Sequence, residues 1–83
     1  MHQKTLQQVE EILAQEVSSI LGLDEEKAPI DEPLDALGMD SMAFVELLVA
    51  IEQQFQLKLM RSEMRREDLR SIRALAARIQ RSS

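Results

Sequence analysis

The chain has 83 residues, which is enough for one small domain, so we expect residues 1–83 to form a single domain. It has no cysteine, which excludes disulfides, thiolate metal sites and a thiol nucleophile of its own. The net charge is −5, with 12 acids and 2 bases in residues 1–57 and 3 acids and 8 bases in residues 58–83. The acidic part would repel phosphate and the basic part has no aromatic residue for stacking on bases, so nucleic acid is not an expected partner.

Hydrophobic residues make up 45% of the chain and aromatic residues 2%, so the core must consist of Leu, Ile, Val, Ala and Met. These residues suit helices more than sheets, and an all-α fold is predicted. No window holds the roughly 20 apolar residues of a membrane span, and the polar start lacks the apolar core of a secretion signal. We therefore expect a cytoplasmic protein, and Met1 favours a separate protein over a piece of a larger synthase.

The first helix is predicted from about Thr5 to Leu21. Apolar residues recur there at steps of three and four: Leu6, Val9, Leu13, Val17 and Ile20. Thr5 and Gln8 have the spacing of a capping box, and Gly22 can adopt the left-handed conformation that ends a helix.

Residues 22–40 are predicted to form a long loop, because they hold both glycines and both prolines of the chain. Loops of this length are uncommon unless they are functional. Its spaced apolar residues, Ile30, Leu34 and Leu37, are expected to hold it against the core. A short helical turn between Asp24 and Lys27 is also predicted.

The second helix is predicted from Asp40, a favourable N-cap residue, to about Gln56. One face should be core: Phe44, Leu47, Leu48, Ile51 and Phe55. A second apolar row, formed by Met42, Val45 and Val49, has two interpretations. It either faces solvent and partners or lies inside a four-helix packing.

The last part of the chain should hold a connection, a short helix and a final helix. Residues expected to anchor the connection are Leu57, Leu59, Met60 and Met64, and a short helix is predicted near Glu63 to Leu69. Ser71 is a candidate N-cap for the last helix. That helix should place Ile72, Leu75, Ala76 and Ile79 inward and Arg73, Arg78 and Arg81 outward.

Ser41 follows Asp40 at the start of the second helix, where unpaired backbone N–H groups and the helix dipole favour a negative group. A phosphodiester on Ser41 would fit there, and Gly38 would let the chain turn without crowding it. The alternative is that Asp40 and Ser41 are only a helix-start signal. A serine hydrolase is disfavoured, because His2 is the sole histidine, lies in the N-terminal tail, and no nucleophile elbow surrounds Ser41. No metal site is expected.

Residues Leu37 to Met42, L-G-M-D-S-M, resemble the attachment motif of the acyl carrier protein family, which includes peptidyl and aminoacyl carriers. The resemblance covers nearly the whole chain. Further similar segments are Val45-Glu46-Leu47, the stretch from Ile51 to Phe55, and Ser71-Ile72 with Leu75 and Ile79.

The resemblance implies a four-helix bundle with a long loop between the first two helices and a short third helix. It implies that a phosphopantetheinyl transferase joins 4′-phosphopantetheine from coenzyme A to Ser41, beside Asp40. The chain, not itself an enzyme, would then carry acyl, aminoacyl or peptidyl groups as thioesters. It implies partner docking through the second helix, at Met42, Val45, Glu46, Val49 and Glu52.

We predict a monomeric, free-standing carrier of a thiotemplate pathway, in polyketide, nonribosomal peptide or aminoacyl-carrier biosynthesis. Its expected partners are a loading enzyme, either an adenylating ligase or an acyltransferase, and a downstream synthase or transferase. Gln53 and Gln54 stand where fatty-acid carriers tend to have acids, which disfavours a generic fatty-acid role. The basic run of Arg61, Arg65, Arg66 and Arg70 is either a solvated face or a patch for an acidic partner. The rival hypothesis is a non-catalytic helical adaptor that binds a protein through Met42, Val45 and Val49.

Overall fold

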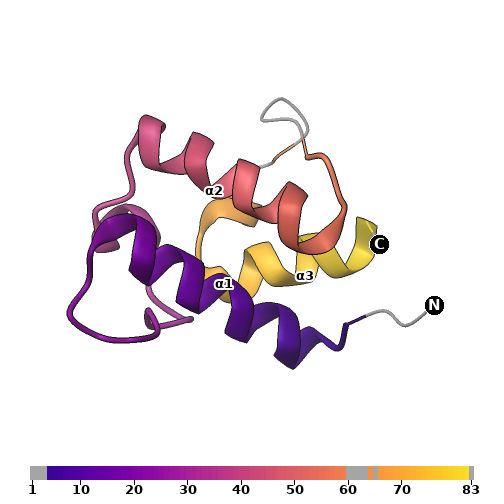
Figure 1. The fold of residues 1–83 in the computed structure, drawn as a ribbon, viewed down its shortest axis with the longest axis horizontal. Coiled ribbons are helices and arrows are strands. Elements are labelled where there is room, and N and C mark those ends of the chain that lie inside the picture. Colours follow the sequence, from indigo (N-terminus) through magenta and orange to yellow (C-terminus); the bar gives the residue numbers. More distant parts are fainter. Residues whose placement is uncertain (1–3, 60–63, 65, 83) are drawn as a thin grey trace.

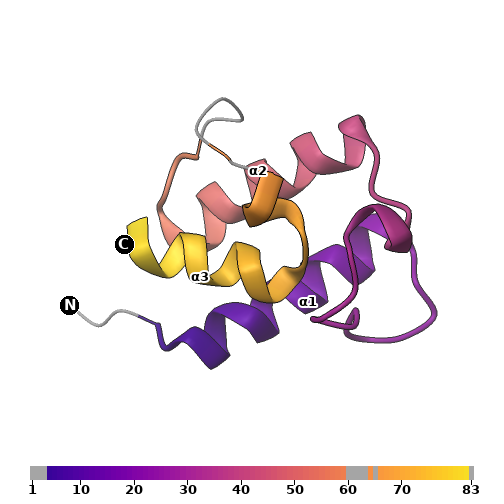
Figure 2. The same cartoon turned by 180° about the vertical axis from the view of Figure 1, so that it is seen from behind.

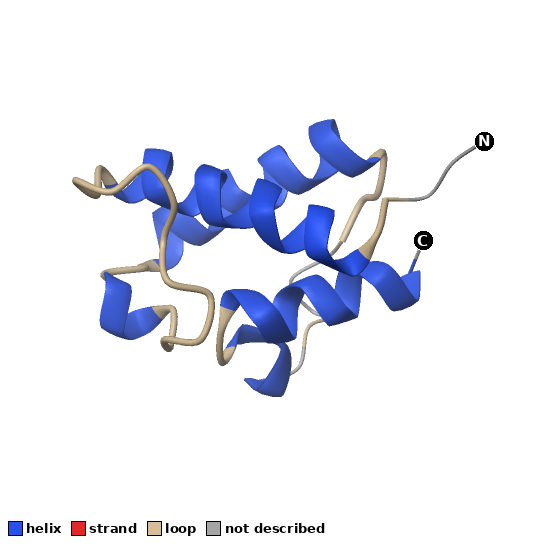
Figure 3. Cartoon of the chain, turned by 90° about the horizontal axis from the view of Figure 1, so that it is seen from below, coloured by secondary structure: helices blue, strands red, loops and turns tan. Residues whose placement is uncertain are grey.

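A computed structural model describes residues 4–59, 64 and 66–82. Its regular elements are three α-helices and two short 3-10 helices: α1 (Leu6–Leu21), η1 (Asp35–Leu37), α2 (Ser41–Phe55), η3 (Arg66–Leu69) and α3 (Ile72–Ser82). Figure 3 shows only helices and loops in this described part, so the all-α prediction is confirmed. Among these residues no helix has both the length and the apolar character needed to cross a bilayer.

The three α-helices form one bundle in which α1 packs against both α2 and α3. Figure 1 shows α1 and α2 running in opposite directions, with the start of α1 and the end of α3 at the same end of the molecule. Seen from behind, the loop between α1 and α2 wraps the other end, and η3 lies between α2 and α3 in that view (Figure 2). This loop end is also where α2 begins.

The core is made of aliphatic side chains and one phenylalanine, as the composition required. Its buried members are Val9, Leu13, Ala14 and Val17 of α1, Phe44, Leu47 and Ile51 of α2, Ile72, Leu75, Ala76 and Ile79 of α3, and Ala28, Leu34 and Leu59 outside the α-helices. Each fully buried Leu, Ile or Val contributes about 1.5–3 kcal/mol relative to exposure. The predicted inward face of α3 is confirmed in full, and the predicted stripe of α1 is confirmed at its three central positions.

The predicted helix ends are confirmed by their capping bonds. Thr5 and Gln8 make both bonds of a capping box, and Gly22 ends α1 with φ of 66°. The Asp40 side chain accepts a hydrogen bond from the Ala43 N–H. The Ser71 hydroxyl accepts one from the Ala74 N–H at the start of α3.

Three details of the predicted core and surface were wrong or incomplete. Leu6 is 41% exposed, and the buried positions of α1 begin at Val9. Leu48 and Phe55 pack against the core but are only partly buried. Arg78 does not point freely outward: its side chain is 21% exposed, and its Nε lies 3.6 Å from a carboxylate oxygen of Asp68.

The loop between α1 and α2 is held in place by hydrogen bonds to its neighbours. The Ala28 N–H donates to the Ala14 carbonyl at 3.0 Å, and the Arg73 N–H donates to the Ile30 carbonyl at 3.0 Å. The Ser18 hydroxyl donates to the Glu25 carbonyl. The helical turn predicted for residues 24–27 is absent, because this segment forms bends whose polar groups bond to α1 instead of to one another.

The predicted contacts that hold the loops are largely confirmed. Leu34 and Leu59 are buried, and four further residues pack partly against the core: Ile30, Leu37, Leu57 and Met64. Met60, with Arg61 and Arg65 of the basic run, lies outside the described residues.

The short third helix is observed as a single 3-10 turn, Arg66–Leu69, and its predicted start at Glu63 lies outside the described residues. The buried carboxylate of Asp68 ties this turn to α3 through Arg78 and through Arg81, whose Nη2 lies 3.5 Å from it. The position of η3 therefore depends on an ionic contact as well as on apolar packing.

Candidate functional site

Ser41 is the first residue of α2, and its side chain is exposed. Asp40 precedes it in extended conformation, and the Asp40 carboxylate accepts a hydrogen bond of 2.8 Å from the Ala43 N–H. The capping role thus belongs to Asp40. Within the described part of the chain the Ser41 hydroxyl makes no hydrogen bond to protein, so it is available to solvent and to a modifying enzyme.

The start of α2 favours an anion next to Ser41. The first N–H groups of a helix have no partner inside it, and the helix dipole adds positive charge there. Asp40 accepts from two of these groups, the Ala43 N–H through its carboxylate and the Phe44 N–H through its backbone carbonyl. For an exposed anion the remaining groups contribute about 0.3–1 kcal/mol. The predicted preference of this position for a phosphodiester therefore has a structural basis.

Gly38 sets the turn that leads the chain into α2. Its φ of 100° lies in the left-handed region that side chains disfavour, and its N–H donates to the Asp35 carbonyl at 3.1 Å. A Cβ atom at this position would meet nothing within 4 Å. The glycine is needed for its backbone conformation, and our expectation that it keeps side-chain atoms away from a group on Ser41 stays a prediction.

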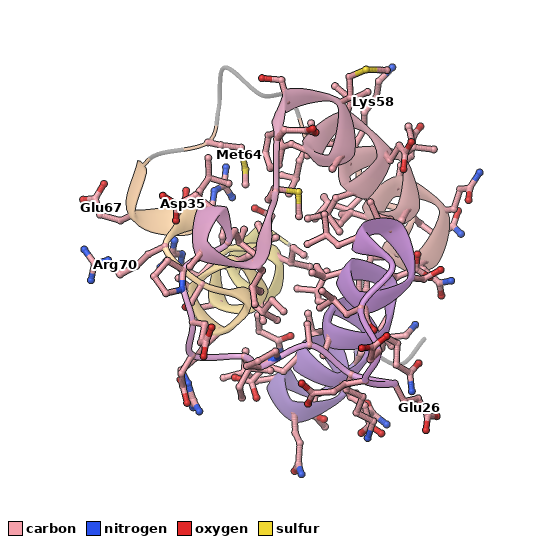
Figure 4. The ribbon with its side chains drawn as sticks, turned by 90° about the vertical axis from the view of Figure 1, so that its left-hand side faces the viewer. Glu26, Asp35, Lys58, Met64, Glu67 and Arg70 are labelled. Carbon is pink, nitrogen blue, oxygen red and sulfur yellow. The ribbon has the colours of Figure 1, made fainter. Side chains whose placement is uncertain are left out.

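A groove of about 700 Å³ opens beside Ser41. Its walls come from the loop before α2, the first turn of α2, and η3 with the residue that follows it. The lining residues are Pro33, Leu34, Asp35, Met39, Asp40, Ser41, Phe44, Glu67, Leu69 and Arg70. Among the residues that the structure describes, the groove thus combines apolar walls with three carboxylates and one guanidinium, and Figure 4 shows Asp35, Glu67 and Arg70 gathered on this side of the molecule.

The apolar row of α2 faces solvent, which decides between the two interpretations left open by the sequence. Met42 is 78% exposed, Val45 51% and Val49 48%. Glu46 and Glu52 are exposed as well. Positions 42, 45, 49 and 52 follow one another at steps of three and four, and position 46 lies four after 42 and three before 49, which places all five along one side of a helix. The structure therefore brings the predicted docking residues together on one uncovered surface.

Two exposed ion pairs support the loop that forms one wall of the groove. Arg73 of α3 binds Asp31 through its Nε at 2.6 Å, and this hydrogen bond lowers the pKa of the Asp31 carboxyl below its ordinary value. Lys27 binds Glu11 of α1 at 2.8 Å, and that hydrogen bond raises the pKa of the Lys27 ammonium. The loop is linked in this way to both α1 and α3.

The described residues fit a flexible prosthetic group attached to a serine. The Ser41 hydroxyl is accessible, the helix start favours a negative linkage, and an adjacent groove offers apolar contact and one cation. No group of three or more histidines or acids in the described ranges is arranged to hold a metal ion.

Comparison with protein families gives the class of this protein. Residues 11–79 match the family described as "Phosphopantetheine attachment site". The chain belongs to this family, the acyl carrier protein family, and its cofactor is covalently attached 4′-phosphopantetheine.

Among curated proteins, the chain is similar to the D-alanyl carrier protein of Lactococcus lactis subsp. cremoris strain MG1363. The two are 38% identical over 65 residues, which cover 77% of this chain and 82% of the relative. The D-alanyl carrier protein of Lactococcus lactis subsp. lactis strain IL1403 is 37% identical over the same lengths. No solved structure matches the chain.

Sequence reasoning predicted the place of Ser41 at the start of α2 and its cap, and it singled out the second apolar row of α2 without deciding its exposure, but it missed the groove. The walls of the groove join Asp35 to Glu67 and Arg70, which lie more than thirty positions later in the chain. Arg70 was noted only as part of a basic run, and no spacing in the sequence links it to Ser41. Only the packing of η3 brings these residues together.

Proposed function

We propose that Ser41 is the attachment point of 4′-phosphopantetheine and that the chain carries aminoacyl groups on it. The observation that carries the proposal is the exposed Ser41 hydroxyl at the start of α2, beside a groove and within the matched residues 11–79. When bound, the arm supplies the thiol that a chain without cysteine lacks. The relatives are D-alanyl carrier proteins, so D-alanine is the first cargo to test.

In the proposed modification the Ser41 oxygen forms a new bond to the β-phosphorus of coenzyme A. The bond from that phosphorus to the adenosine bisphosphate half breaks, adenosine 3′,5′-bisphosphate leaves, and the hydroxyl proton passes to the transferase. The chain contributes an accessible hydroxyl and a helix start that favours the new negative charge. It supplies no catalytic group, so we propose that it is a carrier and not an enzyme.

The proposed partners are a phosphopantetheinyl transferase, an adenylating ligase that loads the amino acid, and a downstream transferase. We assign their docking to the exposed row of α2 with its two glutamates, a surface that offers apolar contact and negative charge. If the fold is described as a four-helix bundle, the four helices are α1, α2, η3 and α3, and the short 3-10 helix η3 is the third. The cytoplasmic location, the monomeric state and a polyketide or nonribosomal peptide pathway stay predictions from the sequence.

The attachment site is tested by modification of the purified chain. Incubation with coenzyme A and a broad-specificity phosphopantetheinyl transferase should add one arm, seen as a single mass increment. Ser41→Ala should abolish the increment without changing the melting temperature, because the side chain is exposed. Ser19→Ala, at an exposed serine of α1, is the matched control and should keep it. An increment that persists in Ser41→Ala would refute the site.

The cargo is tested on the modified protein. With ATP, D-alanine and an adenylating ligase for this amino acid, the mass should rise further by one alanyl group. The added group should be released by hydroxylamine, which cleaves thioesters. Loading of an acyl group from an acyltransferase, with no loading of any amino acid, would contradict the aminoacyl proposal and leave the attachment site intact.

A second candidate is a protein-interaction adaptor that uses Met42, Val45 and Val49. The exposure of this row favours it, since large apolar side chains grouped on a surface often mark interaction sites. The two candidates differ in what Ser41→Ala changes. An adaptor binds its protein partner equally well in this variant, whereas a carrier in this variant can no longer be loaded with cargo.

A further inference from the structure

Arg70 differs from the other arginines whose side chains the structure describes. Arg73 is paired with Asp31, while Arg78 and Arg81 are both paired with Asp68. Arg70 is exposed and has no carboxylate of the described residues within ion-pair distance. Its guanidinium is therefore available for an anion that is not part of the polypeptide.

Arg70 lines the same groove as Ser41 and is the one cation among the lining residues that the structure describes. The other charges of the lining are the carboxylates of Asp35, Asp40 and Glu67. A phosphodiester on Ser41 is fixed by its covalent bond to one wall of this groove. The carboxylates repel it, whereas two features attract it: the N–H groups at the start of α2 and Arg70, the one positively charged side chain among the described lining residues.

We propose that Arg70 is a positioning residue that pairs with the phosphodiester on Ser41 and thereby holds the arm along the groove. The inference rests on the proposed attachment at Ser41. A guanidinium suits this role because its planar set of donors matches two phosphate oxygens. The apolar wall residues Leu34 and Leu69 lie in the same groove and give the rest of the arm a surface to contact. Glu67 opposes the pairing, since its carboxylate lines the same groove.

The pairing is tested by phosphorus NMR of the holo-protein during a salt titration. In the wild-type protein the phosphodiester signal should move with added salt, because screening weakens an exposed ion pair. Arg70→Gln should lose most of this movement, which corresponds to a fall of about one and a half to fivefold in the ratio of docked to free arm. Arg70→Lys should keep part of it, since it keeps the charge but not the planar donors.

Two further variants separate local pairing from net charge. Lys58→Gln removes the same charge at an exposed lysine outside the groove lining, and Figure 4 shows Lys58 well apart from Arg70. It should behave as the wild type does. Glu67→Gln should act in the opposite direction and preserve the docked signal to higher salt. The Arg70 Nε–H signal should also shift between the apo and holo wild-type proteins.

The outcomes distinguish this inference from the proposed function. A wild-type protein that gains no arm would refute attachment itself. A normal mass increment with identical titrations for Arg70→Gln and Lys58→Gln would overturn the role of Arg70 alone, as would an unshifted Arg70 Nε–H signal. Melting temperatures of all variants should match the wild type, because these side chains are exposed.

Discussion

The two faces of α2 have similar chemistry and opposite environments. Phe44, Leu47 and Ile51 on one face are at most 5% exposed, whereas Met42 and Val45 on the other are at least 51% exposed. Both faces are apolar, so hydrophobicity does not tell them apart. The difference is whether other elements cover the face: α1 packs against α2 and helps to bury the first face, and no element of the described ranges buries the second. An apolar side chain stabilises the fold only when the fold covers it, and the uncovered row remains available to partners.

The largest effect should come from truncating the covered face. Leu47 is 0% exposed, so Leu47→Ala should lower the free energy of unfolding by about 2–5 kcal/mol through lost burial and a cavity. A domain of this size can lose most of its stability in this way. Denaturant unfolding followed by circular dichroism measures the change.

Val45→Ala is the control on the opposite face of the same helix. Because Val45 is 51% exposed, we expect a change within about 0.5 kcal/mol. Equal losses of stability in the two variants would contradict the division of α2 into a structural face and a binding face.

The next effect concerns partner binding. Glu46 is exposed beside the apolar row, and α2 holds no basic residue, so its surface suits a partner with basic groups. Glu46→Lys should slow loading by the adenylating ligase several-fold at low salt and less at high salt. The loading rate from a time course of intact mass is the measurement, with circular dichroism to show unchanged helix content.

Glu26→Lys makes the same charge reversal in the loop, at an exposed residue away from α2. It should load at the wild-type rate. If both reversals slow loading equally, the effect belongs to net charge and the exposed face of α2 is not the docking surface.

The smallest effect should be a pH dependence from the loop. Arg73 lowers the pKa of Asp31 below its ordinary value of 3.8, so the unfolded chain binds a proton here more readily than the folded one. The stabilisation is present above that ordinary value and is lost as pH falls through the lower folded pKa. Asp31→Asn should therefore melt below the wild type at neutral pH, and the difference should shrink under acid. A difference that stays constant down to the acid limit would argue against this ion pair.

Much of the site could be predicted from local sequence signals. Helix ends were set by Thr5, Gly22 and Asp40, because capping depends on residues within four positions of one another. The position of Ser41 at the start of α2 followed directly. Two features could not be predicted in this way: the ion pair that partly buries Arg78, and the shortening of the third helix to a single 3-10 turn at Arg66–Leu69. Both depend on contacts with Asp68 and on packing against α3.

The sequence by itself determined an all-α chain, its three α-helices, and a serine at the start of α2, because each rests on periodicity or capping over a few residues. Only the tertiary structure decided which apolar row of α2 is covered and which groove Ser41 faces. It also placed no carboxylate of the described residues within ion-pair distance of Arg70, while it paired the neighbouring arginines of α3. The burial of a helix face and the pairing of a charged side chain depend on segments that are distant in the chain. No local sequence pattern shows which of these segments come into contact in the fold.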